Sequence, residues 1–141
     1  MWKKDDYFIS TDKSLLDFEV IYRFVSCEAY WGQSRSRDTM QKAIDNSALC
    51  FGLYHNQTQI GFARVVSDLA TFGYLGDVFI LSDYRGLGLG KWLLHTIVSH
   101  PELTVLKRLI LFTRTPVFYQ EAGFNIFDQT SERKFMELKF S

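Results

Sequence analysis

A glycine-rich turn at residues 85–91 has the composition of a phosphate-binding site. It reads Arg-Gly-Leu-Gly-Leu-Gly-Lys, with an apolar run before it (residues 74–81) and apolar residues at helical spacing after it (residues 89–98). This pattern predicts a strand, a turn and a helix. The first turn of a helix has backbone N–H groups without intrahelical partners, and glycines let an anion approach them closely. With Arg85 and Lys91 as flanking cations, the expected ligand is a phosphate or diphosphate.

Two common phosphate-binding patterns do not fit this turn. A P-loop needs Ser or Thr after its Gly-Lys pair, whereas Trp92 follows Lys91 here. The dinucleotide fingerprint has the spacing G-x-G-x-x-G in an early βαβ unit, whereas this chain has G-x-G-x-G past its midpoint. The spacing that fits is Arg-x-x-Gly-x-Gly, from Arg85 to Gly90. A surface turn with helix-capping glycines is the alternative interpretation.

The Arg-x-x-Gly-x-Gly spacing resembles the coenzyme A pyrophosphate loop of the GNAT N-acetyltransferases. Residues 119–124, Tyr-Gln-Glu-Ala-Gly-Phe, also resemble the late Tyr-x-x-x-Gly-Phe segment of that family. The two segments lie at the expected separation, and the resemblance covers most of the chain. It implies that acetyl-CoA is a cosubstrate. The residues implied to bind it, largely through their backbone, are Val78, Phe79, Ile80, Arg85, Gly86, Leu87, Gly88, Leu89, Gly90 and Lys91.

Acetyl transfer from a thioester to an amine needs three kinds of group: donors for the thioester oxygen, an acid for the departing thiolate and a neutral amine. By resemblance, a backbone N–H near Val78 supplies a donor. Tyr119 is the candidate acid, since a phenol with an ordinary pKa of about 10 keeps its proton at neutral pH. Asp77 is the candidate base because it interrupts an apolar strand. The alternatives are a packing role for Tyr119, an ion pair for Asp77, and removal of the amine proton through ordered water.

The segment at residues 30–35, Tyr-Trp-Gly-Gln-Ser-Arg, lies in the region that borders the acceptor site in this family. Arg35 is expected to hold a substrate carboxylate, with Trp31 as an aromatic wall. Asp68 is a second carboxylate expected near the cleft. The alternative places Trp31 over the core and Arg35 on the surface. The pattern indicates a small, carboxylate-bearing amine as acceptor, while a peptide or protein amine, or a CoA-binding or partner-binding module without turnover, stays an alternative.

Composition narrows the other possibilities. The 141 residues are 47% hydrophobic and 23% charged, as in one soluble globular domain over residues 1–141. Sixteen basic and sixteen acidic residues cancel, so no overall field attracts nucleic acid or an anionic membrane. A signal peptide and an apolar run of roughly 20 residues are both missing, so we expect a cytoplasmic protein without a membrane partner. The three histidines and two cysteines are scattered, so no metal is expected, and both cysteines are expected to be reduced and buried.

The expected fold class is α/β (α+β), with a mixed, mostly antiparallel central sheet of about six or seven strands and about four helices. Strands are predicted at residues 7–10, 48–54, 60–66, 74–81, 109–113, 124–127 and 134–140. Helices are predicted at residues 14–29, from 36 or 38 onward, at 88–99 and at 116–122. The resemblance implies that the fourth and fifth strands (residues 74–81 and 107–113) splay apart, with the pantetheine arm of CoA between them. The aromatic-bearing last strand could pair with a neighbour in a homodimer.

Overall fold

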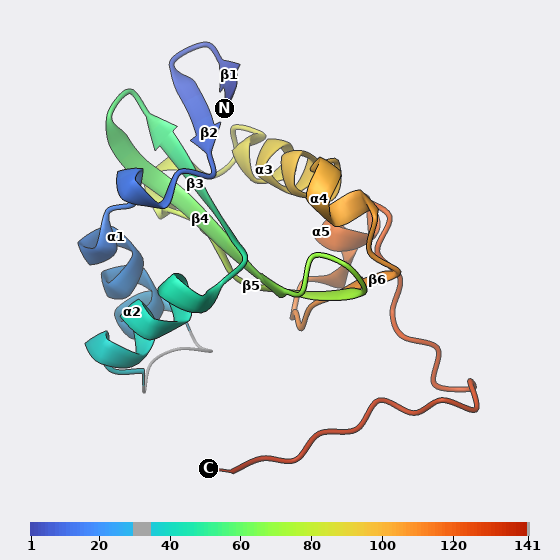
Figure 1. Cartoon of the computed structure of the whole chain (residues 1–141). Helices are drawn as coiled ribbons and strands as arrows, with labels where there is room; N and C mark the ends of the chain where they lie inside the picture. The colour runs from blue at the N-terminus through green and yellow to red at the C-terminus, as the bar shows by residue number, and fades with distance from the viewer. Residues whose placement is uncertain (30–34, 141) are drawn as a thin grey trace.

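The structure is a computed structural model that describes residues 1–29 and 35–140. Its centre is a six-stranded sheet in which the strands follow one another in chain order (Figure 1). Neighbouring strands are antiparallel except for the last two, which run parallel, so the predicted mixed, mostly antiparallel sheet is confirmed. The strands are β1 (Trp2–Lys4), β2 (Tyr7–Ser10), β3 (Leu49–His55), β4 (Thr58–Ser67), β5 (Phe72–Ile80) and β6 (Arg108–Ile110).

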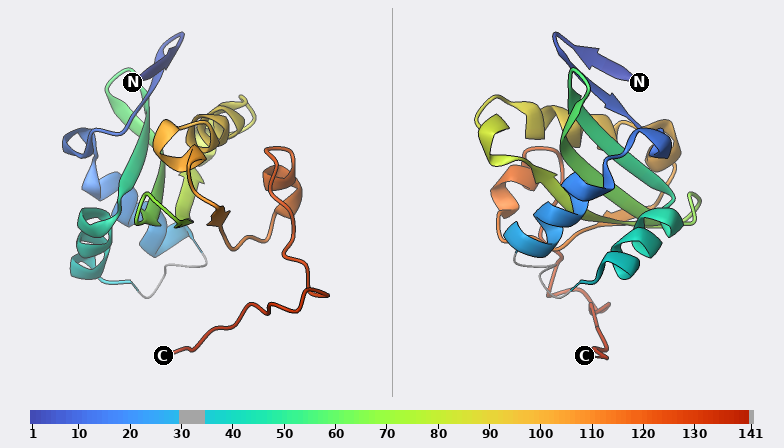
Figure 2. Two further views of the ribbon diagram at one scale, coloured as in Figure 1. Left: turned by 45° about the vertical axis from the view of Figure 1, so that its right-hand side comes forward. Right: turned by 90° about the vertical axis from the view of Figure 1, so that its left-hand side faces the viewer.

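Helices cover both faces of this sheet (Figure 2). One face packs against α1 (Phe18–Arg23), the π-helical turn η2 (Phe24–Glu28) and α2 (Arg37–Asn46). The other packs against α3 (Leu89–Val98) and α4 (Pro101–Thr104). Because both faces are covered, the central strands β3 and β4 are buried along most of their length. The remaining elements are the short turns η1 (Lys13–Leu15) and η3 (Ser82–Tyr84) and the helix α5 (Pro116–Gln120).

The helix predicted at residues 14–29 is divided into η1 and, after a break at residues 16–17, the consecutive elements α1 and η2. Asp12 caps η1, and Asp17 caps α1 by accepting from the N–H groups of Glu19 and Val20 at 3.1 and 3.3 Å. An N-cap residue has extended backbone, so the chain cannot run as one helix through residue 17. The strand β1 and the short helix α4 were not predicted, whereas α2, α3, α5 and the β3–β4 hairpin lie where the sequence predicts them.

The strands predicted at residues 124–127 and 134–140 are wrong. After α5 the chain is irregular and leaves the body of the molecule (Figure 1). Alternating apolar residues are typical of a strand only when a neighbouring strand pairs with them and covers them. Here Met136, Leu138 and Phe140 are 85%, 77% and 93% exposed. The sheet therefore ends at β6.

The last two strands separate along their length. The register joins Phe72–Tyr74 to Arg108–Ile110, after which β6 ends while β5 continues to Ile80. The predicted splay of these two strands is confirmed, although β6 is shorter than residues 107–113. From Leu75 onward, the edge of β5 that faces β6 has no strand partner among the described residues.

The structure also bears on the expectations about a membrane and about the two cysteines. None of the described helices is long and apolar enough to cross a membrane. Cys50 is buried, as predicted, and burial raises the pKa of its thiol. Cys27, in contrast, is exposed, so the prediction of burial is wrong for this residue.

Candidate functional site

The glycine-rich turn joins η3 to α3 and presents a row of unpaired backbone donors. Gly86 and Gly88 both have a φ of +79°, and Gly88 is the N-cap of α3. The first bond into the helix runs from the N–H of Trp92 to the carbonyl of Gly88, at 3.1 Å. Across the described part of the chain, no hydrogen bond is made by the six N–H groups from residue 86 to residue 91. Such a run of donors at a helix N-terminus has the geometry that suits an anion.

The three glycines of the turn serve different purposes. A Cβ atom at Gly86 or Gly88 would meet no atom within 4 Å, so space above the turn is open and the positive φ is what favours glycine. At Gly90, a Cβ atom would lie 3.3 Å from the ring of Phe118 on α5. Gly90 therefore allows α5 to pack closely against the first turn of α3.

The two leucines of the turn differ in their surroundings. Leu89 is buried in the core and anchors the start of α3, whereas Leu87 at the tip is 57% exposed. Because an aliphatic side chain has no hydrogen-bond donor, any role for these two residues in holding an anion is a role of their N–H groups.

The two cations of the turn lie at its rim. Arg85 donates from Nε to the carbonyl of Ile80 at 3.0 Å, which ties the turn to the end of β5 and leaves its Nη groups available for an anion. Lys91 lies 3.4 Å from Glu121 in an exposed ion pair of the kind that contributes little to stability. Both side chains therefore remain able to approach a bound phosphate.

A cleft of about 890 Å³ lies between the end of β5, the chain after β6 and the glycine-rich turn. This volume is in the range of small-molecule pockets. The N–H of Leu81 donates to Ile60 on β4 at 2.8 Å, and backbone groups alternate between the two edges of a strand. The N–H groups of Val78 and Ile80 therefore face the cleft, where the sequence predicts pairing with a ligand.

The side chains of these strand residues point into the two cores. Val78 and Ile80 pack on the side of α3, while Phe79 stacks on Phe24 on the opposite face, with ring centroids 4.1 Å apart. These three residues are the predicted cofactor-binding residues of β5. Because their side chains pack in the cores, they can pair with a ligand through their backbone groups.

Asp77 lies at a β-bulge in β5. The register passes from Phe62 opposite Phe79 to Arg64 opposite Gly76, so β5 has one residue more than β4 in this interval. Asp77 has a φ of +52°, a left-handed conformation that Asp adopts more readily than most residues. Because a bulge re-aims the side chain, the carboxylate points inward and is only 3% exposed.

Two guanidinium groups hold the Asp77 carboxylate. Its Oδ2 accepts from Arg35 Nη1 at 2.6 Å and from Arg64 Nε at 2.7 Å. Burial alone would raise the pKa of Asp77, but the hydrogen bonds and charges of Arg64 and Arg35 outweigh it and hold this pKa below its ordinary value. The structure therefore brings together the predicted site residues Asp77 and Arg35.

Arg64 is a member of this cluster that the sequence analysis missed. It interrupts the apolar strand β4 much as Asp77 interrupts β5, and the two strands are neighbours in the sheet. Opposite charges in two adjacent apolar strands were the signal that could have identified the pair.

Arg35 lines the cleft with 20% of its side chain exposed. Besides Asp77, its Nη1 contacts Met40 Sδ at 3.4 Å, and within the described residues Nε and Nη2 have no hydrogen-bond partner. The two guanidinium groups and the Asp77 carboxylate give this cluster a net charge of one positive, and Glu28 also lines the cleft. A ligand carboxylate fits such a site. Trp31, predicted to act beside Arg35, lies outside the described residues.

Tyr119 reaches the cleft from α5. The rings of Phe118 and Phe124 pack edge-on against it, with centroids 5.0 and 5.9 Å away, so its ring is held from two sides. Since Phe118 also packs on Gly90, the position of Tyr119 depends on the glycine-rich turn.

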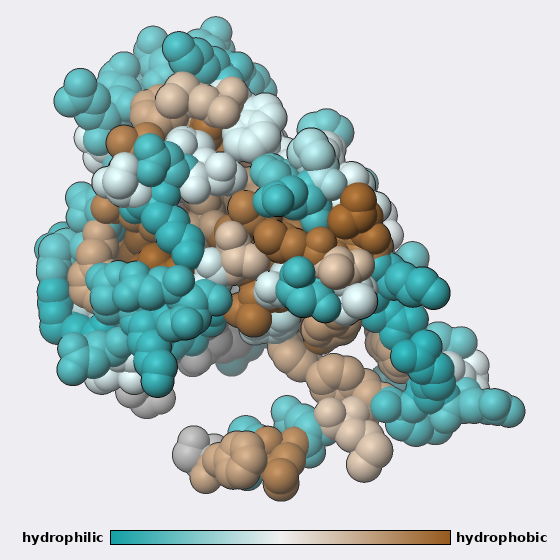
Figure 3. Space-filling view, viewed as in Figure 1, coloured by the Kyte–Doolittle hydropathy of each residue, from teal (hydrophilic) through white to brown (hydrophobic). Residues whose placement is uncertain are grey.

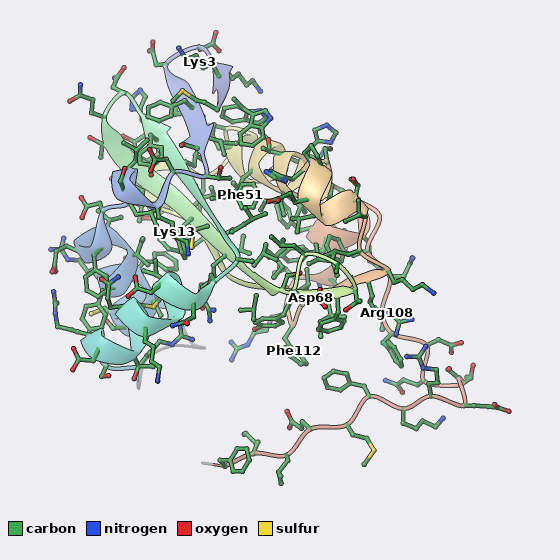
Figure 4. All side chains as sticks on the ribbon, viewed as in Figure 1. Lys3, Lys13, Phe51, Asp68, Arg108 and Phe112 are labelled. Carbon is green, nitrogen blue, oxygen red and sulfur yellow. The ribbon has the colours of Figure 1, made fainter. Side chains whose placement is uncertain are left out.

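Asp68 does not lie in the cleft. It occupies the turn that joins β4 to β5 (labelled in Figure 4), where it accepts from the N–H groups of Ala70 and Thr71 at 2.8 and 2.7 Å. The hydrogen bond from the Thr71 hydroxyl lowers the pKa of Asp68 most, and the two backbone hydrogen bonds lower it further. Its role here is to cap a turn, and the structure does not bring it to the other predicted site residues. Among the described side chains, no group of three could hold a metal ion.

Comparison with known sequences identifies relatives of the chain. A family pattern described as "Acetyltransferase (GNAT) domain" matches residues 46–126, which include β5, the glycine-rich turn and α5. A protein of Gibberella zeae named as an acetyltransferase is 32% identical over 115 residues. That match covers 68% of this chain and 64% of the relative, so the chain spans less than two thirds of the relative's length.

Solved structures share the fold. A crystal structure from Xanthomonas campestris pv. campestris, described as belonging to the GNAT family, is 39% identical with a TM-score of 0.83, covering 96% of each chain. N-acetylglutamate synthase from Neisseria gonorrhoeae, whose structure holds coenzyme A and N-acetyl-glutamate, has a TM-score of 0.69. It is 22% identical and covers 87% of this chain and 29% of its own, which is a likeness of fold alone.

Proposed function

The chain belongs to the GNAT acetyltransferase family, and from this premise we propose that it transfers acetyl from acetyl-CoA to the amine of a small, carboxylate-bearing molecule. One observation carries the proposal. A single cleft is bordered at one end by six unpaired N–H groups and at the other by a cationic cluster built on Arg35 and Asp77. The first suits the diphosphate of CoA, and the second suits an acidic acceptor.

For the reaction to occur, the thioester of acetyl-CoA must lie between the glycine-rich turn and the Arg35–Asp77 cluster. The unpaired edge of β5 offers the N–H of Ile80 to the pantetheine arm and that of Val78 to the thioester oxygen. The amine nitrogen attacks the thioester carbon, which forms a C–N bond, and the C–S bond breaks. A donor placed at the oxygen stabilises the negative charge that develops there.

The departing thiolate needs a proton, and we assign its delivery to the Tyr119 hydroxyl. The ring is fixed by Phe118 and Phe124 and lines the cleft, so the hydroxyl is held on a rigid support. The tyrosine recovers a proton from water after each turnover.

We assign Asp77 the role of positioning Arg35 and not the role of the general base. Its carboxylate is buried and bound to two guanidinium groups, which lowers its pKa and makes it a poor proton acceptor. Held by Asp77, Arg35 keeps Nε and Nη2 directed to a ligand. The attacking amine then loses its proton to water in the cleft.

An acetylation assay tests the function as a whole. The protein is incubated with acetyl-CoA and a panel of amines, in which each amino acid is paired with its amide, and the release of CoA thiol is measured. We expect transfer to acids in preference to amides. Transfer to peptides alone would contradict the proposed acceptor, and binding of acetyl-CoA without transfer to any amine would make the chain a binding module.

The substitution Tyr119→Phe tests the proposed acid. We expect kcat to fall about 100-fold, in the range for general acid catalysis, with little change in acetyl-CoA affinity. Tyr22→Phe is the matched control, because Tyr22 lies on α1 beside Arg37 and away from the cleft. Unchanged turnover in Tyr119→Phe would remove this residue from the chemistry.

Arg35→Lys tests the acceptor site. A lysine keeps the charge but has no planar fork, so it cannot hold Asp77 and a substrate carboxylate together in the same way. We expect the preference for an amino acid over its amide, expressed as a ratio of kcat/KM values, to fall at least about 10-fold, as for the loss of one charged hydrogen bond. The amide serves as an internal control, and an unchanged ratio would place the carboxylate elsewhere.

A further inference from the structure

Glu28, the last residue of η2, brings an exposed carboxylate to the wall of the cleft. Two other residues from this part of the chain, Phe24 and Ala29, line the cleft beside it. Hydrophilic side chains also cover the surface over α2, at the lower left of Figure 3, but the described residues of α2 do not line the cleft. Glu28 therefore differs from an ordinary solvated charge on a helix surface.

The wide turn of η2 fixes where this carboxylate lies. The N–H of Ala29 donates to the carbonyl of Phe24, five residues earlier, at 3.0 Å, which is the hydrogen bond of a π-helix. Residues four and five apart lie on the same side of such a turn, so Glu28 lies on the side of Phe24. The ring of Phe24 stacks on Phe79 of β5, with centroids 4.1 Å apart. This contact holds the turn that carries Glu28 beside the neighbour of Val78, whose N–H is assigned to the thioester oxygen.

The carboxylate of Glu28 has no counter-charge in the part of the chain that the structure describes, where it makes neither an ion pair nor a hydrogen bond. Asp77, the other carboxylate among the described residues of the cleft wall, is bound to two guanidinium groups. Glu28 is therefore the carboxylate of this wall that remains able to take a positively charged group or a proton.

The negative charge of Glu28 suits the acceptor and not the cofactor. Acetyl-CoA carries negative charges on its phosphates, which a carboxylate repels. The acceptor, in contrast, enters the cleft as an ammonium ion, because an alkyl amine has a pKa near 10.4 in water. A carboxylate on the wall attracts this ion. It can then accept the proton that the nitrogen must lose before it attacks the thioester.

We propose that Glu28 is the general base of the reaction, and that its carboxylate accepts one proton of the acceptor's ammonium group through a water in the cleft. This inference rests on the proposed function and names the group that receives the proton from that water. The neutral nitrogen attacks the thioester carbon, the C–N bond forms and the C–S bond breaks. The thiolate takes the proton of Tyr119. The new amide nitrogen loses its second proton to water, and Glu28 releases its proton to solvent.

Glu28 and Arg35 present opposite charges to the same cleft. Because Asp77 holds Nη1 of Arg35 at 2.6 Å, these two charges do not pair with each other in the described structure. Arg35 suits the carboxylate of an acceptor, and Glu28 suits its ammonium group. The pair therefore favours an amino acid over an amine that lacks the carboxylate.

Two acceptors of the same length distinguish a base from a group that only binds. β-Alanine is an ammonium ion at neutral pH, whereas aminooxyacetate has an oxygen in place of one methylene group and a nitrogen that is already neutral. We expect Glu28→Gln to lower kcat for β-alanine about 100-fold, in the range for general base catalysis, and to leave kcat for aminooxyacetate nearly unchanged. Turnover of aminooxyacetate also shows that the variant is folded. Glu19→Gln, at an exposed position on α1, is the matched control and should keep both activities.

The pH dependence of turnover gives a second measurement. Raising the pH converts β-alanine to its neutral form in solution, so a base becomes unnecessary. We expect the ratio of the wild-type kcat/KM to that of Glu28→Gln, measured with β-alanine, to fall toward one as the pH rises to about 10.

Equal losses for the two acceptors at every pH, or no loss for either, would overturn the assignment of Glu28 while the proposed function stands. If the wild type acetylates neither compound at millimolar concentration, the proposed carboxylate-bearing acceptor is wrong, and the base assigned to it is wrong with it.

Discussion

Replacing Gly88 with valine is expected to weaken acetyl-CoA binding at least about 100-fold in a protein that still folds. Gly88 has a φ of +79°, and the space above it is open, so a side chain would project where the diphosphate is proposed to lie. The loss of two charged hydrogen bonds at about 1.5 kcal/mol each corresponds to that factor. Isothermal titration of the variant with acetyl-CoA measures it.

The control variant for this experiment must introduce the same strain at a positive φ but must lie outside the glycine-rich turn. Gly123→Val meets this requirement, since Gly123 also has a positive φ of +105° and no atom within 4 Å of an added Cβ. We expect Gly123→Val to lose stability and to keep its affinity. Equal affinities for Gly88→Val and the wild type would mean that the turn is only a helix cap.

Asp77→Asn is expected to lower the free energy of unfolding by about 3 kcal/mol, because it leaves two largely buried guanidinium groups without their counter-charge. Asn tolerates the left-handed backbone of the bulge as well as Asp does, so the change isolates the charge. Thermal unfolding at neutral pH should show a Tm lower by roughly 10 °C. Glu19→Gln, in an exposed pair with Arg37, is the control and should change Tm little.

The pH dependence of the free energy of unfolding tests whether the charge of Asp77 causes this loss of stability. The pKa of Asp77 is lowered in the folded protein, so its ionised form contributes stability above the unfolded pKa, which is about 3.9. That contribution is lost as the pH falls through the lower, folded pKa. The difference in stability between wild type and Asp77→Asn should therefore narrow below about pH 4. A difference that stays constant into acid would show that the charge is not its cause.

Local patterns in the sequence were enough to predict the part of the fold that forms the proposed diphosphate site. The hairpin of β3 and β4, the strand β5 and the helix α3 each follow from apolar periodicity bounded by polar or glycine-rich turns. Gly88 and Leu89 mark the start of α3 within one residue, because a left-handed N-cap and a buried anchor are both local requirements.

Most of the features that the sequence analysis missed depend on residues that are distant in the chain, and Asp68 is the exception. The pairing of Asp77 with Arg64 arises from the alignment of two strands and a bulge between them, which spacing along the chain does not encode. Asp68 was placed near the cleft because it follows a strand, whereas its position is set by hydrogen bonds within its own turn. At residues 134–140 the strand pattern is present, but a strand forms only where a neighbour is available.

The central claim is that the glycine-rich turn holds the diphosphate of acetyl-CoA. Titration of the full chain with acetyl-CoA, and with an acetyl-pantetheine thioester that lacks the diphosphate, tests it most directly. We predict micromolar binding of acetyl-CoA and binding of the shorter thioester at least about 100-fold weaker, as expected for the loss of several charged hydrogen bonds. Equal affinity for the two ligands, or no binding of acetyl-CoA at millimolar concentration, would contradict it.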